Sequence, residues 1–444
     1  MKKRLFKIYY FCFALIFIVF SFPIVSFAEV TDRVDEIPDY YKNNFIAIST
    51  PEEFNDVRKD LDGNYYLAND IIFTDEMFAL GGEFYNNGAG FNPIGEDFSG
   101  VFDGMNYSIV GLLSNSRNAG VFKCVSGKVT RLNIVNYSCS IITASNNCVI
   151  GGIASSVIGP GSISYCNTSG QIELINSNGC VGGIVGEQEF GSVITKCFSS
   201  IDIICQNESG DMAQGSSVFG GISGMCSGKI DNCGYIGNIS KNKIAEGGSI
   251  PIQYDNIGGI AGSTFDSISY CYFAGTITYP GDSYGTAGYV SATLYRCFSI
   301  NSVMFNNKTH NGTCDTYSLT ESQMKNPLSY IDWDFINVWE INNNISFPTI
   351  RKCEQSEMGF SGGNGSKDTP YLITSKYQLL NMSGQADVYF NLCNDIEFDE
   401  TDTKAGGVLY ELNFYCECLD DNDFKGIFDG CGYSIKGINY IEKG

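Results

Sequence analysis

The stretch Gly182-Gly183-Ile184-Val185-Gly186 decides the fold, because related copies of it recur along the chain. Three copies begin at Gly151, Gly220 and Gly258, and a divergent copy is read as Ala-Gly-Tyr-Val at residues 287–290. The starts are separated by 31, 38, 38 and 29 residues. A period of this size is typical of solenoid proteins, in which each repeat buries its apolar face against its neighbours.

A second element follows each glycine motif and reads aliphatic-x-x-Cys, with a further aliphatic residue six positions after the cysteine. Its cysteines are Cys166, Cys197, Cys233, Cys271 and Cys297, and an earlier copy carries Leu132 in the same place. Because leucine replaces cysteine there, the pattern predicts a core ladder of buried thiols. Disulfides between stacked coils are the second hypothesis, because neighbouring coils lie about 4.8 Å apart. A metal site is the third, since the chain has no Cys-x-x-Cys pair.

The segments between these elements predict short parallel strands. Ser200-Ile201-Asp202-Ile203 alternates polar and apolar residues, as expected for a strand with one buried face. Such strands are too short to be stable alone, whereas stacked repeats pair each backbone donor with the next coil. The glycines are expected at tight corners, where a side chain would clash or where φ is positive. The expected fold class is therefore all-β, a parallel β-helix; a β-propeller is the alternative, disfavoured because no four-stranded set recurs with a regular hairpin turn.

A longer duplication relates the two ends of the chain. Residues 98–109 return as 424–435, and residues 67–71 return as 392–396. The predicted organisation is a signal peptide at 1–28, an N-terminal leader at 29–44, a β-helix unit at 45–355, a Gly/Ser linker at 356–366 and a partial second unit at 367–444. The second unit has no glycine ladder, so it is expected either to pack as a cap on a neighbour or to be truncated.

The N-terminus has the pattern of a Sec-type signal peptide. A basic start at residues 2–7 precedes an apolar stretch at 8–25, and small residues at Ser26 and Ala28 predict cleavage after Ala28. We therefore expect a secreted or cell-surface protein, which would contact a membrane only if this segment stays uncleaved. The net charge of −22 argues against nucleic acid as a partner.

Carboxylates offer the main case for catalysis. A glycosidase needs two carboxyl groups about 5–10 Å apart, and Asp70 and Asp103 are the natural pair. Both recur in the second unit, as Asp395 and Asp429, in sequences typical of turns. We therefore interpret all four as turn caps that accept hydrogen bonds from backbone amides. The single histidine, His310, cannot supply the His-Glu-x-x-His site of a zinc metallopeptidase.

Two longer connections are better candidates for function. Residues 206–217 and 241–255 lengthen the second and third repeats. Insertions in a solenoid gather on one face, which is often the binding face. Tyr254, Tyr279 and Tyr284 lie near these connections and are the candidate binding-loop residues. They would either stack on sugars or partner proteins, or only cover the flank of the coil.

In combination, these motifs resemble GLUG-motif proteins. The resemblance rests on the Phe-Asp-Gly turn at 102–104 with Ile-Val-Gly-Leu at 109–112, on the glycine ladder and its cysteines, and on the closing segment 324–350 and re-entry at 363–373. It implies a secreted or surface right-handed β-helix, of the kind found in adhesin-like bacterial proteins and beside IgA-specific metallopeptidase domains. The motif is structural and implies no catalytic residues.

The sequence therefore predicts a non-catalytic protein that binds a partner or displays loops on a β-helix scaffold, with no cofactor and no metal. The partner would be an unidentified protein or a glycan. The alternative is a carbohydrate-active β-helix enzyme, a lyase or a glycosidase, with carboxylates on adjacent coils. Acids aligned beside a groove would favour the enzyme, whereas converging polar and aromatic loops would favour binding.

Overall fold

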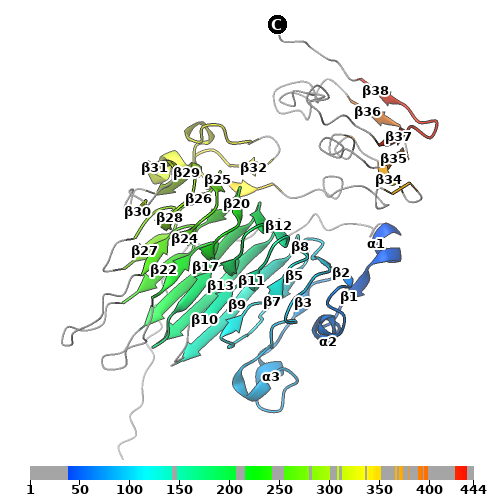
Figure 1. Cartoon of the computed structure of the whole chain (residues 1–444). Helices are drawn as coiled ribbons and strands as arrows, with labels where there is room; N and C mark the ends of the chain where they lie inside the picture. The colour runs from blue at the N-terminus through cyan, green and yellow to red at the C-terminus, as the bar shows by residue number, and fades with distance from the viewer. Residues whose placement is uncertain are drawn as a thin grey trace, which may run out of the picture. The chain divides into compact units, whose positions relative to one another are not determined.

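The computed structural model describes residues 39–142, 148–206, 216–242, 255–279, 283–300, 308–309, 313–335 and 338–351, and in the C-terminal part 366–367, 370–373, 379, 389–393, 395–398 and 426–437. The predicted signal peptide and most of the predicted linker lie outside these residues. The described part of the first unit is a parallel β-helix, which confirms the predicted fold class (Figure 1).

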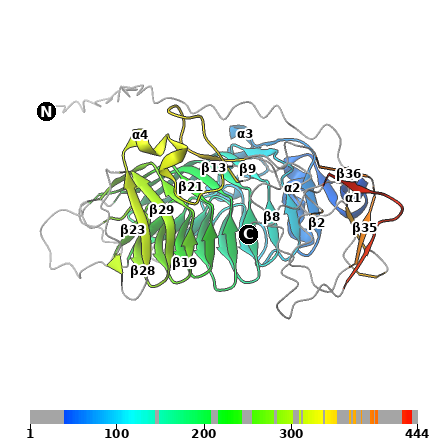
Figure 2. The same ribbon diagram turned by 90° about the horizontal axis from the view of Figure 1, so that it is seen from above.

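Between residues 118 and 279, each coil of the β-helix contributes strands to three parallel sheets. The coil at residues 179–206 shows the plan: β14 (Gly179–Gly182), β15 (Val185–Gln188), β16 (Val193–Thr195) and β17 (Phe198–Gln206). Here β14 joins a five-stranded sheet, β15 joins a seven-stranded sheet, and β16 and β17 both join a long sheet of nineteen strands, all counted over the described residues. Figure 2 shows equivalent strands of successive coils lying side by side along the stack.

The remaining strands repeat this plan. The five-stranded sheet also holds β6 (Asn118–Ala119), β10 (Cys148–Gly151), β18 (Val218–Gly220) and β23 (Asn256–Gly258). The seven-stranded sheet also holds β7 (Phe122–Val125), β11 (Ala154–Val157), β19 (Ser223–Cys226), β24 (Ala261–Thr264), β28 (Ala287–Val290) and β30 (Lys308–Thr309). The long sheet also holds β1 (Ile46–Ile48), β2 (Asn64–Leu67), β3 (Ile71–Ile72), β4 (Val101–Asp103), β5 (Ser108–Val110), β8 (Lys128–Thr130), β9 (Asn133–Ile142), β12 (Ser162–Ser164), β13 (Asn167–Ile175), β20 (Lys229–Asp231), β21 (Gly234–Tyr235), β22 (Asn238–Lys241), β25 (Ile268–Ser269), β26 (Tyr272–Phe273), β27 (Thr276–Thr278), β29 (Leu294–Ile300) and β31 (Cys314–Leu319).

The core consists of columns of identical or similar side chains. Ile163 pairs with Ile194 in the neighbouring coil, and Ile194 pairs with Ile230 in the next. All three are fully buried. Burying each such side chain is worth about 1.5–3 kcal/mol, so the stability of the helix is distributed along its axis.

The glycine motifs are needed because neighbouring backbones approach closely. A Cβ on Gly183 would lie 2.2 Å from the carbonyl oxygen of Gly221 in the next coil. A Cβ on Gly182 would lie 2.0 Å from the carbonyl oxygen of Val185. Such contacts are impossible for real side chains. These glycines are therefore explained by the predicted clash of a side chain with the neighbouring backbone.

The predicted register of the last glycine copy is wrong. Residues 287–290 were expected to match Gly258-Gly259-Ile260-Ala261, yet Ala261 pairs with Ala287 and Gly258 forms a bridge with Tyr284. The true equivalent is therefore the segment 284–287, three residues earlier. The close-packed glycine is the reason, because Gly285, like Gly259, lies where a Cβ would clash.

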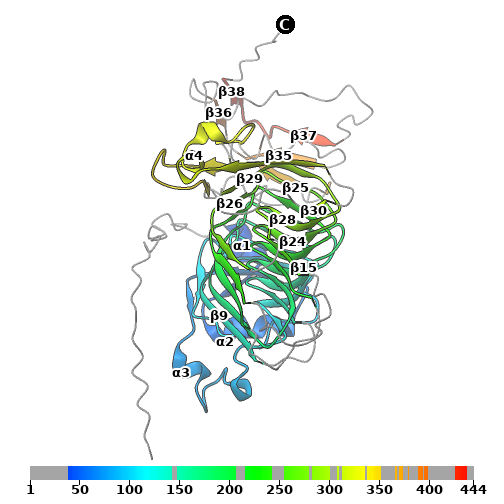
Figure 3. The same cartoon turned by 90° about the vertical axis from the view of Figure 1, so that its left-hand side faces the viewer.

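Short helices and turns lie outside the sheets. They are α1 (Asp39–Asn44), α2 (Pro51–Asp56), α3 (Asp75–Phe78), α4 (Glu321–Met324) and the 3₁₀ turns η1 (Val57–Lys59), η2 (Asn86–Gly88) and η3 (Pro327–Ser329). Thr50 caps α2 by accepting a hydrogen bond from the Glu53 amide, and Phe54 on this helix is fully buried in the core. Figure 3 looks onto the end of the stack that carries β29 and β30. Trp339, in the segment that follows these strands, packs against Tyr272 and Trp333. An antiparallel pair, β32 (Trp339–Glu340) and β33 (Thr349–Ile350), accompanies this cluster.

The described part of the second unit repeats the pairing of the first. Its strands are β34 (Tyr371–Ile373), β35 (Tyr389–Leu392), β36 (Ile396–Glu397), β37 (Ile427–Asp429) and β38 (Ile435–Lys436). In this unit β35 pairs with β34 and β37, and β36 pairs with β38, all in parallel. The equivalent strands β1, β2 and β4, and β3 and β5, pair in the same way in the first unit.

Candidate functional site

The cysteine ladder runs along the long sheet: its first four members lie at the corner between two strands, and Cys297 lies within β29. Cys166, Cys197, Cys233, Cys271 and Cys297 are all fully buried and carry free thiols. Each thiol donates to the carbonyl two residues earlier, for example Cys197 Sγ to Thr195 O at 3.3 Å. Burial raises the pKa of the Cys166, Cys197 and Cys271 thiols well above the ordinary range. These three thiols are therefore poor nucleophiles, and all five ladder cysteines are buried in the manner of small apolar groups.

The residue before each ladder position adopts a left-handed backbone conformation. These residues are Arg131, Tyr165, Lys196, Asn232, Tyr270 and Arg296, with φ between 50° and 52°. Glycine was expected at corners with positive φ, and this expectation is wrong here. The side chains of these residues make contacts at the corner. Lys196 Nζ lies 4.8 Å from the centre of the Tyr165 ring in the neighbouring coil, and Trp339 donates a hydrogen bond to the Asn232 side chain.

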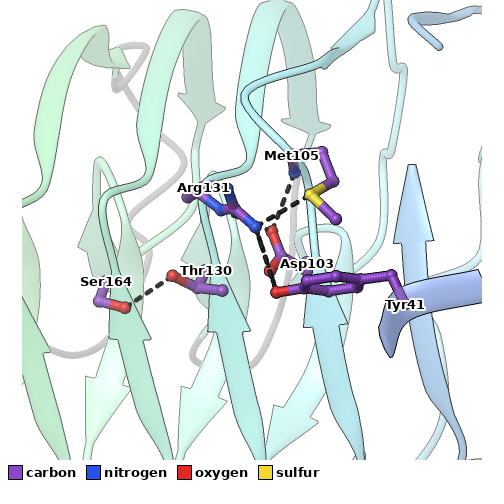
Figure 4. Close-up of polar contacts among 6 residues, drawn as sticks. All are labelled: Tyr41, Asp103, Met105, Thr130, Arg131 and Ser164. Atoms are coloured by element: carbon purple, nitrogen blue, oxygen red, sulfur yellow. Dashed lines mark hydrogen bonds and ion pairs between the residues drawn. The ribbon is translucent and has the colours of Figure 1, made fainter. Parts of the chain in front are cut away.

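Asp103 lies in a buried ion pair that the sequence did not predict (Figure 4). Arg131 Nη2 lies 2.7 Å from Asp103 Oδ2, and both side chains are almost fully buried. Tyr41, on α1, donates to the same oxygen at 2.7 Å. Asp103 Oδ1 also accepts a hydrogen bond from the Met105 amide, which closes the turn. The leader residue Tyr41 is thus part of the first unit's packing.

The other three aspartates also bind backbone amides. Asp70 accepts from the Ser108 amide in the next coil at 2.9 Å. Its counterpart Asp395 accepts from the Ser434 amide at 2.7 Å, and this hydrogen bond lowers the pKa of the Asp395 carboxyl. Asp429 accepts from the Cys431 amide at 2.8 Å, as Asp103 does from Met105.

A second buried ion pair lies where the two long connections leave the coils, and we call it the loop-root cluster: Lys241, Asp255, Ser217 and Tyr279. Lys241 Nζ lies 2.7 Å from Asp255 Oδ2 and 2.8 Å from Ser217 Oγ. Tyr279 donates to Asp255 Oδ2 at 2.9 Å, and the Ser217 amide donates to Asp255 Oδ1 at 2.9 Å. The side chains of the ion pair are each only 3% exposed.

The loop-root cluster fixes both ends of the longer connection and one end of the shorter. Lys241 ends β22 and Asp255 precedes β23, while Ser217 precedes β18. Removing one partner of such a pair leaves a buried, uncompensated charge, which costs about 3–5 kcal/mol. The connecting residues 207–215 and 243–254 lie outside the described residues.

The three candidate tyrosines have different surroundings. Tyr279 is a member of the loop-root cluster. Tyr284 forms a bridge with Gly258 and so occupies the first position of the glycine motif in its coil. It is only 8% exposed, so its ring offers no open face for stacking. Of the two expectations for Tyr284, its burial fits a side chain that covers the flank of the coil better than one that stacks on a ligand. Tyr254 and His310 lie outside the described residues.

One shallow, polar hollow lies at the N-terminal coils, with a volume of about 360 Å³. Its lining includes Arg58, Asn92, Asn118 and Lys123. Arg58 donates to the carbonyl oxygens of Asn92 and Pro93, and Lys123 pairs with Glu96. The hollow therefore offers amide, hydroxyl and ion-pair groups of the kind that hydrogen-bond a polar ligand.

The fold and its repeated corners define the class: a parallel β-helix repeat protein. The model of the GLUG motif matches residues 177–204, which correspond to a single coil from just before β14 to within β17. This coil carries the GLUG motif, and the resemblance seen in the sequence is confirmed there.

Similar chains are also found among solved structures. The crystal structure of a "putative immunoglobulin A1 protease from Bacteroides ovatus" is 18% identical, with a TM-score of 0.48, and the match covers 69% of this chain and 92% of that one. No curated protein matches the chain. Among the described residues, no helix is long and apolar enough to cross a membrane.

Proposed function

We propose that this GLUG-motif protein is exported and binds a protein or glycan through a row of loops along one edge of its β-helix, without catalysing a reaction. The observation that carries the proposal is the loop-root cluster. A buried ion pair with two further hydrogen-bonding partners holds the bases of two long connections at fixed positions on adjacent coils. A rigid base lowers the entropy that loops lose when they bind a partner.

The same edge carries a connection in five successive coils. The long strand of each coil is followed by a segment that leads to the five- or seven-stranded sheet: residues 143–147, 176–178, 207–215, 243–254 and 280–282. These connections start from strands that pair in register, so their bases repeat about every 4.8 Å. Loops of different length on a regular scaffold are a common way to build a binding face.

The chemistry of the chain suits a neutral or cationic partner. With a net charge of −22, the protein would repel polyanions at low salt and attract cationic surfaces. Export is supported by the signal-peptide pattern at residues 1–28. An acidic, loop-bearing β-helix outside the cell is suited to adhesion.

The chain itself supplies the loop with which to test this proposal. In the coil before the first long connection, β13 and β14 are joined by only Asn176-Ser177-Asn178. We would replace residues 207–215, 243–254 or both with this short sequence and probe glycan arrays and extracellular-matrix proteins. The shortened variants should lose binding while keeping the melting temperature of the wild type.

Two results would overturn the proposal. One is a shortened variant that melts like the wild type and still binds every ligand with full affinity. The other is release of reducing ends or unsaturated sugars from a bound polysaccharide, because that would establish a carbohydrate-cleaving enzyme. A Lys241→Met variant serves as the control for loops that are present but no longer held at their base.

A further inference from the structure

The second unit carries two cysteines at positions where the first unit has none. Cys393 corresponds to Ala68 in the duplicated stretch, and Cys431 corresponds to Met105. The neighbouring residues are retained: Asn69-Asp70 returns as Asn394-Asp395, and the Phe-Asp-Gly turn precedes both Met105 and Cys431. The second unit therefore has cysteines at two positions where the first unit has alanine and methionine, within an otherwise similar sequence.

The backbone brings these two positions to the same end of two neighbouring strands. Strands β35 and β37 pair in parallel, with Tyr389 beside Ile427, Phe390 beside Phe428 and Asn391 beside Asp429. Cys393 directly follows the last residue of β35, and Cys431 follows the last residue of β37 by two positions, so the two cysteines leave neighbouring strands at the same end. Neighbouring strands lie about 4.8 Å apart, within the 4.4–6.8 Å between Cα atoms that a disulfide requires.

The surroundings of this pair differ from those of the cysteine ladder. Ladder thiols are fully buried, whereas Cys393 is half-buried and Cys431 is exposed. A disulfide donor can therefore reach Cys431 but not Cys197. Partial desolvation and Asp429 raise the pKa of Cys431, and Cys393 lies close enough to add a smaller electrostatic contribution.

We propose that Cys393 and Cys431 form a disulfide that links adjacent coils of the second unit. The thiolate of one cysteine attacks a small disulfide such as oxidised glutathione, which forms a mixed disulfide and releases one reduced thiol. The thiolate of the other cysteine then attacks the mixed disulfide and releases the second reduced thiol. Each protein thiol loses one proton to solvent or to a departing thiolate, and the added disulfide takes up the two electrons.

In the cell this reaction depends on the proposed export, because the cytosol keeps thiols reduced. The cross-link would hold β35 against β37 and close the chain between them into a loop. In the first unit the equivalent corner is held by Arg131, Tyr41 and Met105 around Asp103. The disulfide would serve the same structural purpose with different chemistry.

The test uses the full chain, reduced and then equilibrated with oxidised and reduced glutathione, trapped with N-ethylmaleimide and mapped by mass spectrometry. We expect a peptide cross-linked between Cys393 and Cys431 and two fewer free thiols than in the reduced protein. The variants Cys393→Ala and Cys431→Met restore the first-unit residues, and each should abolish the cross-link. Met is acceptable at 431 because Met105 already adopts the same positive φ. The Cys314→Ser variant removes another exposed cysteine and should leave the cross-link intact.

A second measurement reports on the structural effect. Proteolysis within residues 367–444 should be slowed by oxidation in the wild type, on the order of a hundredfold for a loop of this length. The Cys393→Ala/Cys431→Met variant should show no dependence on oxidation. Recovery of Cys393 and Cys431 as separately alkylated residues, or joined to other cysteines, would overturn the proposal. A cross-link that forms in the purified chain but is missing from protein isolated from cells supports the pair and contradicts export.

Discussion

Asp103 and Asp429 occupy equivalent places in the duplicated stretch, yet their environments differ. Each accepts a hydrogen bond from the amide two residues later, at 2.9 and 2.8 Å, so the same short sequence forms the same turn. Asp103 is also buried against Arg131 and Tyr41, whereas Asp429 is exposed. The turn is therefore a local property of the Phe-Asp-Gly sequence. Burial depends on the segments that pack over it.

The largest expected effect comes from breaking the first-unit ion pair. Arg131→Met should lower the free energy of unfolding by about 3–5 kcal/mol, because it leaves the Asp103 carboxylate buried without its cation. Urea denaturation of the full chain measures this loss. Asp429→Asn is the matched control in the second unit and should change stability by less than about 0.5 kcal/mol. Equal effects of the two variants would contradict the difference in burial.

A glycine in each turn gives the second comparison. A Cβ on Gly104 would lie 2.4 Å from the carbonyl oxygen of Arg131, whereas one on the equivalent Gly430 would meet nothing closer than 3.7 Å. Gly104→Ala should therefore cost about 1–3 kcal/mol, because the neighbouring coil must shift. Gly430→Ala should be nearly neutral in the same denaturation experiment. If alanine were tolerated at 104, the close packing of the first-unit coils would be wrong.

Tyr41 tests the contribution of the leader helix. Tyr41→Phe removes one hydrogen bond to Asp103 and should cost about 0.5–1.5 kcal/mol. The double-mutant cycle with Arg131→Met separates this hydrogen bond from the ion pair. Additive effects would show that Tyr41 stabilises α1 independently of the buried charges.

The smallest effect is the pH dependence of the second unit. The Ser434 amide lowers the folded-state pKa of Asp395, so its stabilisation is present above the unfolded-state pKa near 4. It is lost as the pH falls through the lower, folded-state value. In the wild type, the Ser434 amide should therefore lose protection against hydrogen exchange as the pH falls. In the Asp395→Asn variant, acid should reduce this protection less. A wild-type amide whose protection is unchanged down to pH 2 would contradict this coupling.

The repeats could be predicted from the sequence because their spacing is visible in it. The glycine motif and the apolar columns follow directly from residues such as Gly183 and Ile184, whose roles depend on local alternation and close packing. The shift at Tyr284 could not be foreseen, because a decayed copy leaves two alignments of similar quality. The pairing of Ala261 with Ala287 and the bridge between Gly258 and Tyr284 distinguish them.

The two buried ion pairs were missed for a different reason. Arg131 and Asp103 are 28 residues apart, and they meet only because adjacent coils stack. A cue was present, since long basic or aromatic side chains precede several ladder positions, as Lys196 does before Cys197. Lys241 and Asp255 are separated by a connection of irregular length, so no repeat pattern relates them. The sequence alone therefore could not identify the loop-root cluster.

The central claim is that neighbouring coils bury equivalent positions in the first unit and leave the second unit more open. Brief alkylation of the reduced, native full chain with N-ethylmaleimide tests it most directly, with site occupancy read by mass spectrometry. The account predicts that Cys166, Cys197, Cys233, Cys271 and Cys297 remain unmodified until the protein is unfolded, whereas Cys431 reacts at once. Ready labelling of the ladder cysteines in the native protein, or protection of Cys431, would contradict it.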